Sequence, residues 1–234
     1  MNKPTQLIFP FQINQKATFE SFFCIPDNLH LITRLSEIVS SDSAHELFIH
    51  GEKGSGKSFL MQAICNELST SGKQLAFIPM SKAINMGVEI FQNLATLDAV
   101  CIDDLQIILA NHEWEMALFN LINECQQSEC SLMLSFGGTE LIEENIQLPD
   151  LLSRIKRMEF TTLHAVRDEF FNQAINFVTQ QLDINIDQPE LEFLLKHQTR
   201  KFSLLVENII TLDKQAASLK RKITIPLIKE TLSL

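Results

Sequence analysis

The stretch from Gly51 to Ser58 constrains this chain more than any other part of its sequence. It reads GEKGSGKS, which matches the spacing G-x-x-x-x-G-K-S of loops that wrap phosphate groups. A short apolar run over 47–49 precedes the stretch, and a helical pattern of apolar residues follows it over 57–71. Strand, glycine-rich loop and helix in this order predict a nucleoside polyphosphate site, because the N–H groups of the loop and the N-terminus of the helix attract anions.

Each residue type in this loop has a physical reason. Glycine adopts backbone conformations that other residues avoid, and these turn successive N–H groups toward phosphate oxygens. We expect the side chain of Lys57 to neutralise the β- and γ-phosphates and the hydroxyl of Ser58 to bind Mg²⁺. An ordinary glycine turn with an exposed lysine is the alternative. The residues expected to hold ADP or ATP are Gly51, Gly54, Ser55, Gly56, Lys57, Ser58 and Phe59, together with Ser135 at the end of a later strand.

Two consecutive acids follow the apolar run over 99–102. A buried strand there places Asp103 at its carboxyl end, where it can hold a metal ion together with Ser58 and water. Asp104 can orient or activate the attacking water, so it is a candidate catalytic residue. A helix-capping role is the alternative for both acids. The expected metal ligands are therefore Ser58 and Asp103.

Strand-like and helix-like segments alternate up to about residue 162. Runs that are apolar on both faces alternate with helical patterns, which is typical of a parallel sheet covered by helices. After residue 163 only helical patterns remain, so we expect an α/β fold followed by a small all-α domain. The expected divisions are an extended tail over 1–17, a nucleotide-binding domain over 18–162 and a helical domain over 163–234. Expected strands lie near 47–49, 75–78, 99–102, 132–134 and 158–162, and expected helices near 29–39, 57–71, 81–95, 112–127, 164–182, 188–198, 202–219 and after Pro226.

Composition argues against several functions. The chain has 29 acidic and 19 basic side chains and a net charge of −10, so it lacks the basic balance of a protein that binds DNA tightly on its own. The basic run Lys220-Arg221-Lys222 fits a solvated segment between two elements. Five cysteines without a C-x-x-C pair favour reduced, structural thiols. The sequence has no run of about 18 apolar residues and no secretory signal, so we expect a cytoplasmic protein without membrane contact.

The first residues of the chain contain an apolar island in a polar surrounding. Leu7, Phe9 and Phe11 stand close together, and Pro10 opposes a helix there. Two interpretations stay open from these residues alone. The rings can pack onto the core of the same chain. Alternatively, the extended segment can fill an apolar cleft of a partner at a low entropic cost, while the amide of Gln6 makes polar contacts.

Several segments resemble the DnaA family of AAA+ proteins, the bacterial replication initiators. Asp103-Asp104-Leu105-Gln106 resembles the metal-site segment of this family, and Thr18-Phe19-Glu20-Ser21-Phe22, followed by Asn28, resembles its entry segment. The sequence reaches Leu234 without room for the initiators' DNA-binding helix-turn-helix domain. Residues 6–11 resemble the short peptide by which such proteins bind the replication sliding clamp. Both of these features narrow the resemblance, which covers nearly the whole chain, to the DnaA-related regulators of the Hda group.

The resemblance implies a negative regulator of the initiation of DNA replication. In this expectation the nucleotide-bound protein binds the DNA-loaded sliding clamp, the β subunit of DNA polymerase III, and stimulates ATP hydrolysis by ATP-bound DnaA. Segment 148–154 resembles the family's arginine-finger segment, so Arg154 is expected to stabilise the charge that develops on the partner's γ-phosphate. DNA would be contacted mainly through these partners, and a homodimer is compatible with the family. The expected clamp-binding residues are Gln6, Leu7, Phe9 and Phe11.

Two departures from the family pattern bear on hydrolysis. The family usually carries an aspartate after the sensor strand, but Ser135-Phe136-Gly137-Gly138 offers only Ser135 as a polar contact here, with Gly137 at the likely sensor position. The lid position of the family's second sensor arginine falls on Ser203, with Arg200 nearby. Both departures predict weak or absent hydrolysis of the chain's own nucleotide, with binding intact. Two alternatives stay open: a self-contained ATPase, such as a helicase loader, and a non-enzymatic, nucleotide-gated adaptor for the clamp.

Overall fold

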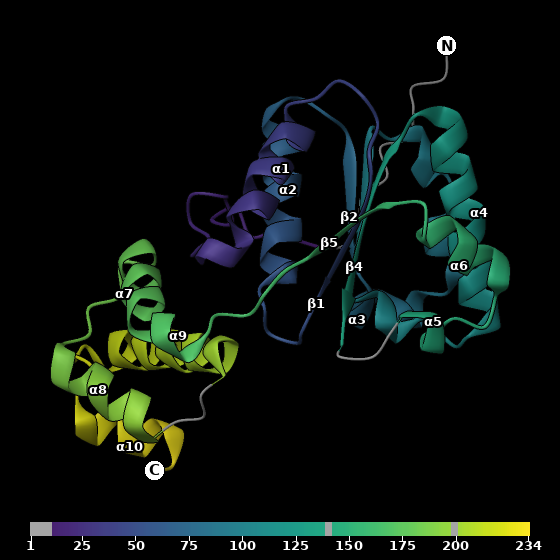
Figure 1. Ribbon diagram of the computed structural model, residues 1–234. Coiled ribbons are helices and arrows are strands. Elements are labelled where there is room, and N and C mark those ends of the chain that lie inside the picture. Colours follow the sequence, from purple (N-terminus) through teal and green to yellow (C-terminus); the bar gives the residue numbers. More distant parts are fainter. Residues whose placement is uncertain (1–10, 139–141, 198–200) are drawn as a thin grey trace.

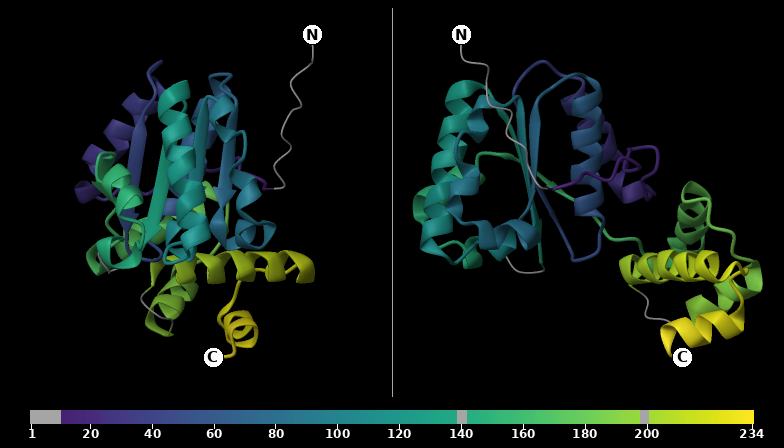
Figure 2. Two further views of the ribbon diagram at one scale, coloured as in Figure 1. Left: turned by 90° about the vertical axis from the view of Figure 1, so that its right-hand side faces the viewer. Right: turned by 180° about the vertical axis from the view of Figure 1, so that it is seen from behind.

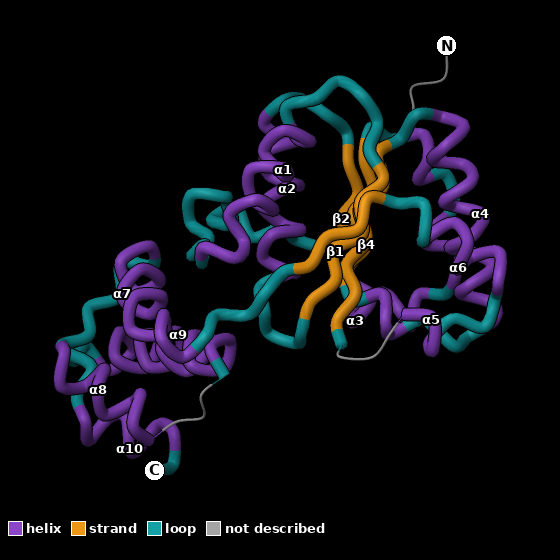
Figure 3. Tube along the Cα trace, viewed as in Figure 1, coloured by secondary structure: helices purple, strands orange, loops and turns teal. Residues whose placement is uncertain are grey.

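The computed structural model describes residues 11–138, 142–197 and 201–234 of the chain. Within these ranges five strands form one parallel sheet in the order β2-β3-β4-β1-β5, with helices on both faces and a helical unit after β5 (Figure 1, Figure 3). This arrangement confirms the expected α/β fold with a helical second domain. None of the described helices is long and apolar enough to cross a membrane. The strands are β1 (Glu46–Gly51), β2 (Leu75–Pro79), β3 (Ala99–Asp103), β4 (Ser131–Gly137) and β5 (Glu159–Thr162).

Alternation along β1 explains why both faces of the sheet need helices. Phe48 belongs to the apolar cluster on one face, whereas Leu47 and Ile49 belong to the cluster on the other. All three side chains are fully buried, so the strand reads as a continuous apolar run. The face of Phe48 is covered by α4 (His112–Ser128) and α6 (Pro149–Ile155), and the opposite face by α1 (Leu29–Val39) and α2 (Lys57–Thr70), as Figure 1 shows.

The prediction of one helix near 81–95 is wrong. A short helix, α3 (Met80–Ala83), is followed by 3-10 turns, because Gly87 with φ 82° and Asn93 with φ 62° place left-handed backbone where a helix would continue. Phe91 is nevertheless buried in the cluster beside α4. The spacing of apolar residues therefore predicted correctly that this stretch is buried, but not that it lacks a regular helix. The turns are η2 (Ile84–Met86), η3 (Val88–Phe91) and η4 (Leu94–Thr96).

The helical unit after β5 has an apolar core of its own. Ile175, Leu194 and Ile209 are fully buried in it. Its first helix is shorter than expected, because 164–167 form no helix and the 3-10 turn η6 (Asp168–Phe170) comes first. Figure 2 shows from two further sides that this unit lies at one end of the sheet. The helices of the unit are α7 (Phe171–Gln181), α8 (Gln188–His197), α9 (Phe202–Leu219) and α10 (Ile225–Leu232).

Residues 11–17 lie against the α/β unit. The side-chain amide of Asn66 on α2 donates to the carbonyls of Asn14 at 2.9 Å and Ala17 at 2.7 Å, and Ala17 is fully buried. Phe11 is half-buried and packs against the cluster on the α4 face. This part of the segment is therefore fixed to the core. Outside the described residues lie Gln6, Leu7, Phe9 and Arg200.

Candidate nucleotide-binding site

The loop after β1 has the backbone that its glycines predict. Gly54 has φ 85° and Gly56 has φ 103°, a region in which any side chain is strained. α2 begins directly afterwards at Lys57, so the first N–H groups of this helix have no helical partner. Strand, left-handed loop and helix N-terminus together form a turn suited to phosphate.

Lys57 lies folded over this loop. The residue is 5% exposed, and its ammonium donates to the carbonyls of Gly51 and Glu52, both at 2.8 Å. Burial lowers the pKa of Lys57, and the carboxylates of Asp104 and Asp103 oppose that shift. A phosphate in the loop would give this buried cation a charged partner in place of neutral carbonyls, which makes a stronger hydrogen bond.

Asp103 ends β3 and is buried beside the loop. Burial raises its pKa, while hydrogen bonds from the hydroxyls of Ser135 and Ser58 lower it. Ser135 donates to Asp103 Oδ1, and its oxygen accepts from the N–H of Asp104 at 3.0 Å. The structure thus brings the two expected metal ligands, Ser58 and Asp103, together. The hydroxyl of Ser135 is fully buried and bound to the two acidic residues.

Gln106 joins the site although no role was predicted for it. Its amide donates to Asp104 Oδ1 at 2.9 Å, and its carbonyl oxygen accepts from the N–H of Gly137 at 2.8 Å. Asp104 itself has left-handed backbone with φ 62°. Gln106 therefore ties the carboxylate of Asp104 to the end of β4, and its place two residues after the acids was the available sequence signal.

A cavity of about 720 Å³ opens beside the loop at the carboxyl ends of β1 and β5, with His50, His164 and Arg167 in its wall. Arg167 forms an ion pair with Asp27 at 3.2 Å. Asn28, which is 2% exposed, binds both the N–H and the carbonyl of His164 at 2.9 Å. These contacts fix the entry segment to the connection between β5 and the helical unit. The cavity is the space into which a nucleotide can extend from the loop.

The helical unit reaches the loop through the first turn of α9. A Cβ atom added to Gly54 would lie 2.6 Å from the hydroxyl oxygen of Ser203. On the other side a Cβ atom added to Gly56 would lie 2.9 Å from the ring of Phe22, and this ring contacts that of Phe59 with 6.0 Å between centroids. Ser203 therefore stands where the resemblance expects a residue that senses the phosphates, with a hydroxyl in place of a guanidinium.

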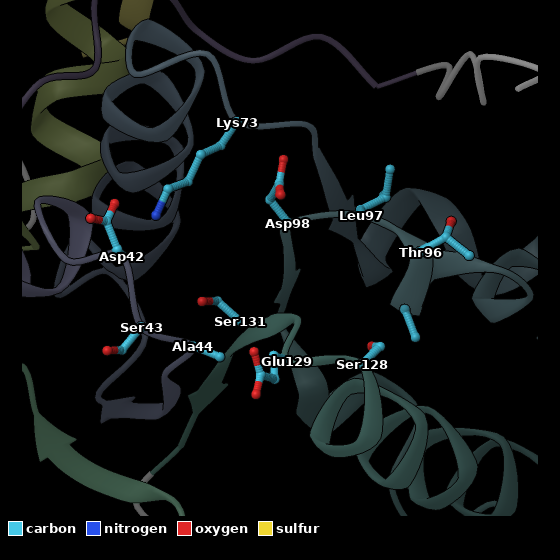
Figure 4. A pocket seen from close by; sticks show the side chains of 11 residues that line it. Asp42, Ser43, Ala44, Lys73, Thr96, Leu97, Asp98, Ser128, Glu129 and Ser131 are labelled. Carbon is cyan, nitrogen blue, oxygen red and sulfur yellow. The ribbon is translucent and has the colours of Figure 1, made fainter.

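A second hollow, of about 310 Å³, lies at the amino ends of the strands (Figure 4). Its polar groups bind neighbouring loops: Lys73 donates to the carbonyl of Ser41 at 2.8 Å, and Asp98 accepts from the N–H of Gln74 at 2.6 Å. Ligands of open parallel sheets bind beyond the carboxyl ends of the strands. This hollow is therefore at the wrong end of the sheet for the nucleotide.

Arg154 is not part of this loop. It lies on α6, which packs against α4 on the face of the sheet opposite α2 (Figure 1). Its guanidinium donates to Gln126 Oε1 at 3.4 Å and lies 6.0 Å from the ring centre of Phe119, and both partners belong to α4. This position separates Arg154 from the chain's own phosphate loop and leaves it half-buried at the surface.

Comparison with known proteins identifies the family. The family model of the bacterial DnaA ATPase domain matches residues 13–139 of the 234, which is more than half of the chain. The chain belongs to the DnaA family. A second family model, that of the Hda lid domain, matches residues 168–232. This member of the DnaA family thus joins an AAA+ nucleotide-binding domain to a lid of the Hda kind, the combination of a DnaA-related replication regulator.

Solved structures show the same fold at low sequence identity. Domain III of the Thermotoga maritima replication initiation protein DnaA has a TM-score of 0.78 at 18% identity, over 95% of this chain and 98% of that one. AMPPCP-bound DnaA from Aquifex aeolicus has a TM-score of 0.68 at 21% identity, over 89% and 69%. The Thermotoga maritima RuvB Holliday junction branch migration motor has a TM-score of 0.61 at 15% identity, over 92% and 73%.

Proposed function

We propose that this member of the DnaA family is a negative regulator of replication initiation that acts on DnaA itself. In its nucleotide-bound form it binds the DNA-loaded sliding clamp and stimulates ATP hydrolysis by ATP-bound DnaA. The observation that carries the proposal is the union of a DnaA-type ATPase domain with an Hda-type lid in one chain. A regulator that resembles its target can dock on it as a neighbouring AAA+ subunit would.

The residues of the loop fit a nucleoside polyphosphate with Mg²⁺. Gly54 and Gly56 supply the left-handed turn, and Lys57 is a buried cation whose present partners are carbonyls. Asp103 and Ser58 would hold Mg²⁺. Among the described residues no group of three or more metal-ligating side chains gathers, so phosphate oxygens and water would complete the coordination. When bound, the phosphates would supply the negative charge that Lys57 lacks as a partner, and the metal would offset part of that charge.

The lid contact supports binding without efficient turnover. Ser203 brings a neutral hydroxyl to the loop where the family's second sensor brings a cation, so it adds no charge to stabilise a developing γ-phosphate charge. Ser135 is bound to Asp103 and Asp104 and is fully buried. We therefore propose that the chain's own nucleotide is a bound ligand that sets the relative orientation of the helical unit, the lid, and the α/β unit.

Arg154 is proposed as the residue that acts on DnaA. A guanidinium is always charged and offers a rigid fork of donors, which suits the spread charge of a phosphoryl group in transfer. An arginine finger delivered by a partner raises the rate of hydrolysis by about 10³- to 10⁵-fold. The position of Arg154 on α6, away from the loop of its own chain, is compatible with delivery to another subunit.

The experiment is ATP hydrolysis by DnaA in the presence of clamp-loaded DNA and this protein. Arg154→Ala should remove the stimulation, whereas Arg157→Ala, which changes the next exposed arginine along the chain, should keep it. Circular dichroism and nucleotide affinity should be the same for both variants. An Arg154→Ala protein that stimulates as well as the parent would show that the finger assignment is wrong.

Clamp binding is proposed for residues 6–11. Because Phe11 packs on the core, it would hold the base of the peptide while the preceding residues reach the clamp. A triple change of Gln6, Leu7 and Phe9 to alanine should abolish capture by the clamp and leave nucleotide binding unchanged. Capture at the parent's level would exclude this segment as the ligand.

The complete phosphate loop and the paired acids Asp103 and Asp104 also fit a self-contained ATPase. That alternative predicts turnover without DnaA and its loss on Lys57→Ala. A nucleotide-gated adaptor predicts instead that clamp binding matters and that Arg154 is dispensable. The hydrolysis assay separates all three when the parent, Arg154→Ala and Lys57→Ala proteins are each measured with and without DnaA.

A further inference from the structure

A fully buried carboxylate on α4 has no part in the nucleotide site. Glu115 is 0% exposed. Its two oxygens accept from the N–H groups of Ala110 at 2.8 Å, Gln147 at 3.1 Å and Leu148 at 2.7 Å. No basic side chain forms an ion pair with it in the described part of the chain. Three backbone N–H groups therefore hold this carboxylate in place, and the carboxylate is the hydrogen-bond acceptor for all three.

These donors belong to two segments: the one that follows the acids of the nucleotide site, and the one that leads into α6. Leu148 is the N-cap residue of α6, the helix that carries Arg154. Ala110 ends the segment that starts at Asp104, and both ends of this segment have left-handed backbone, with φ 62° at Asp104 and φ 63° at Ala110. Such a conformation costs a non-glycine residue energy and persists where neighbouring contacts impose it. Glu115 supplies that contact at Ala110.

Two further residues of α4 continue the support toward Arg154. Phe119 and Gln126 follow Glu115 by four and eleven positions, so all three lie on one face of the helix. Phe119 and Gln126 contact the guanidinium of Arg154. We name Glu115, Phe119 and Gln126 the α4 stripe. It holds the start of α6 at one end and the arginine at the other.

We infer that Glu115 is a positioning residue for Arg154. It fixes the start of α6 on α4 and ties that helix to the segment that follows the acids of the chain's own nucleotide site. Arg154 is thus held in one position on α4 before docking, so less of its conformational freedom is lost when it meets the phosphates of the partner. The inference rests on the proposed role of Arg154 in the hydrolysis of DnaA-bound ATP.

Glu115→Gln is the test, because it keeps the size of the side chain but turns one acceptor into a donor that faces backbone N–H groups. In the DnaA hydrolysis assay we expect the maximal stimulated rate to fall by about tenfold to a hundredfold, as for a catalytic group misplaced by about 1 Å. The amount of protein that gives half the effect and the affinity for Mg-ADP should stay unchanged. Glu124→Gln, the same change at an exposed position of α4, is the control.

A double-mutant cycle separates positioning from general damage. In an Arg154→Lys protein, which keeps the positive charge and with it part of the stimulation, Glu115→Gln should cause a smaller further loss than in the parent, because the residue acts through the guanidinium of Arg154. Hydrogen exchange should be faster at the Gln147 and Leu148 amides in Glu115→Gln, with the strands unchanged. Should Glu115→Gln fail to fold, Gln126→Ala at the exposed end of the stripe is expected to lower the rate in the same non-additive way.

The outcomes that overturn the inference are separate from failure of the proposed function. A Glu115→Gln or, in its place, Gln126→Ala protein as active as the parent overturns the inference alone. So does a loss of equal factor in the parent and in the Arg154→Lys protein, since that indicates a structural role. A parent protein that gives no stimulation overturns the proposed function, and the inference falls with it.

Discussion

Replacing Gly56 by alanine tests the geometry of the phosphate loop most sharply. Gly56 has φ 103°, and an added Cβ atom would lie 2.9 Å from the ring of Phe22. The chain offers a matched control in Gly72, which has φ 79° and no atom within 4 Å of an added Cβ. Both changes strain the backbone, but only Gly56→Ala also displaces a ring beside the loop.

The difference between the two variants isolates the crowding at the loop. Left-handed backbone costs an alanine about 1–2 kcal/mol, and this cost is common to both variants, as is the lower entropy of their unfolded chains. Displacing a packed ring costs about 1–3 kcal/mol more. Gly56→Ala should therefore lower the free energy of unfolding by about 2–5 kcal/mol, against about 1–2 kcal/mol for Gly72→Ala.

Urea unfolding measures both losses, and calorimetry with Mg-ADP measures the effect on the ligand. Misplacing one charge-assisted N–H donor costs about 1.5–3 kcal/mol, so the affinity of Gly56→Ala should fall by about tenfold to a hundredfold. Gly72→Ala should bind as the parent does. Equal stability losses in the two variants, with unchanged affinity in Gly56→Ala, would refute the loop geometry described above.

Three other changes follow from the contacts around the site. Asp103→Asn should keep or raise the free energy of unfolding at neutral pH, and it should remove the Mg²⁺ dependence of nucleotide binding. Burial raises the pKa of Asp103 in the folded protein, so protonation of this carboxylate favours folding at low pH. That contribution to stability is lost as the pH rises through the raised pKa. Asn28→Ala should lower the free energy of unfolding by about 2–4 kcal/mol, because both backbone groups of His164 lose their partner. Glu159→Gln should lower the free energy of unfolding by about 1 kcal/mol or less, because the ion pair with Arg34 lies at the surface, and this difference should vanish in high salt. Hydrogen bonds from Arg34 lower the pKa of Glu159, so the difference should also vanish as the pH falls through the lowered pKa.

Urea unfolding at several pH values and salt concentrations checks all three. A parent and an Asp103→Asn protein with the same pH dependence would contradict the burial of that carboxylate. Asn120→Ala, at an exposed position, is the control for Asn28→Ala, and equal losses would contradict the contact with His164. A Glu159→Gln difference that persists in high salt would point to a cause other than the ion pair.

Local patterns were enough to predict most of the fold. The spacing of the glycines in Gly51–Ser58 predicts the backbone conformation of this loop. The apolar run of β1 and the helical periodicity of α2 and α4 follow from the burial of these elements in the sheet or on one of its faces. The stretch over 80–96 shows the limit of periodicity. Its apolar residues are buried as a helix would bury them, but Gly87 and Asn93 turn the chain between them.

Long-range contacts at the site were beyond sequence reasoning. Asn28 and His164 are separated by 136 residues, and Glu115 meets Leu148 across 33, so no local pattern marks either pair. The hydroxyl of Ser135 illustrates a second limit. Its residue type allowed a contact with nucleotide, whereas its bonds to Asp103 and Asp104 depend on how β3 and β4 pair.

Binding of a nucleoside polyphosphate at the turn between β1 and α2 underlies every role proposed for this protein. Isothermal titration calorimetry of the folded protein with Mg-ADP and Mg-ATP measures it directly. We predict a heat of binding for the parent and its loss in Lys57→Ala, with a cooperative thermal unfolding of the variant showing that it is folded without ligand. A folded parent that gives no heat with either nucleotide, or a Lys57→Ala protein that binds equally well, would contradict the central claim.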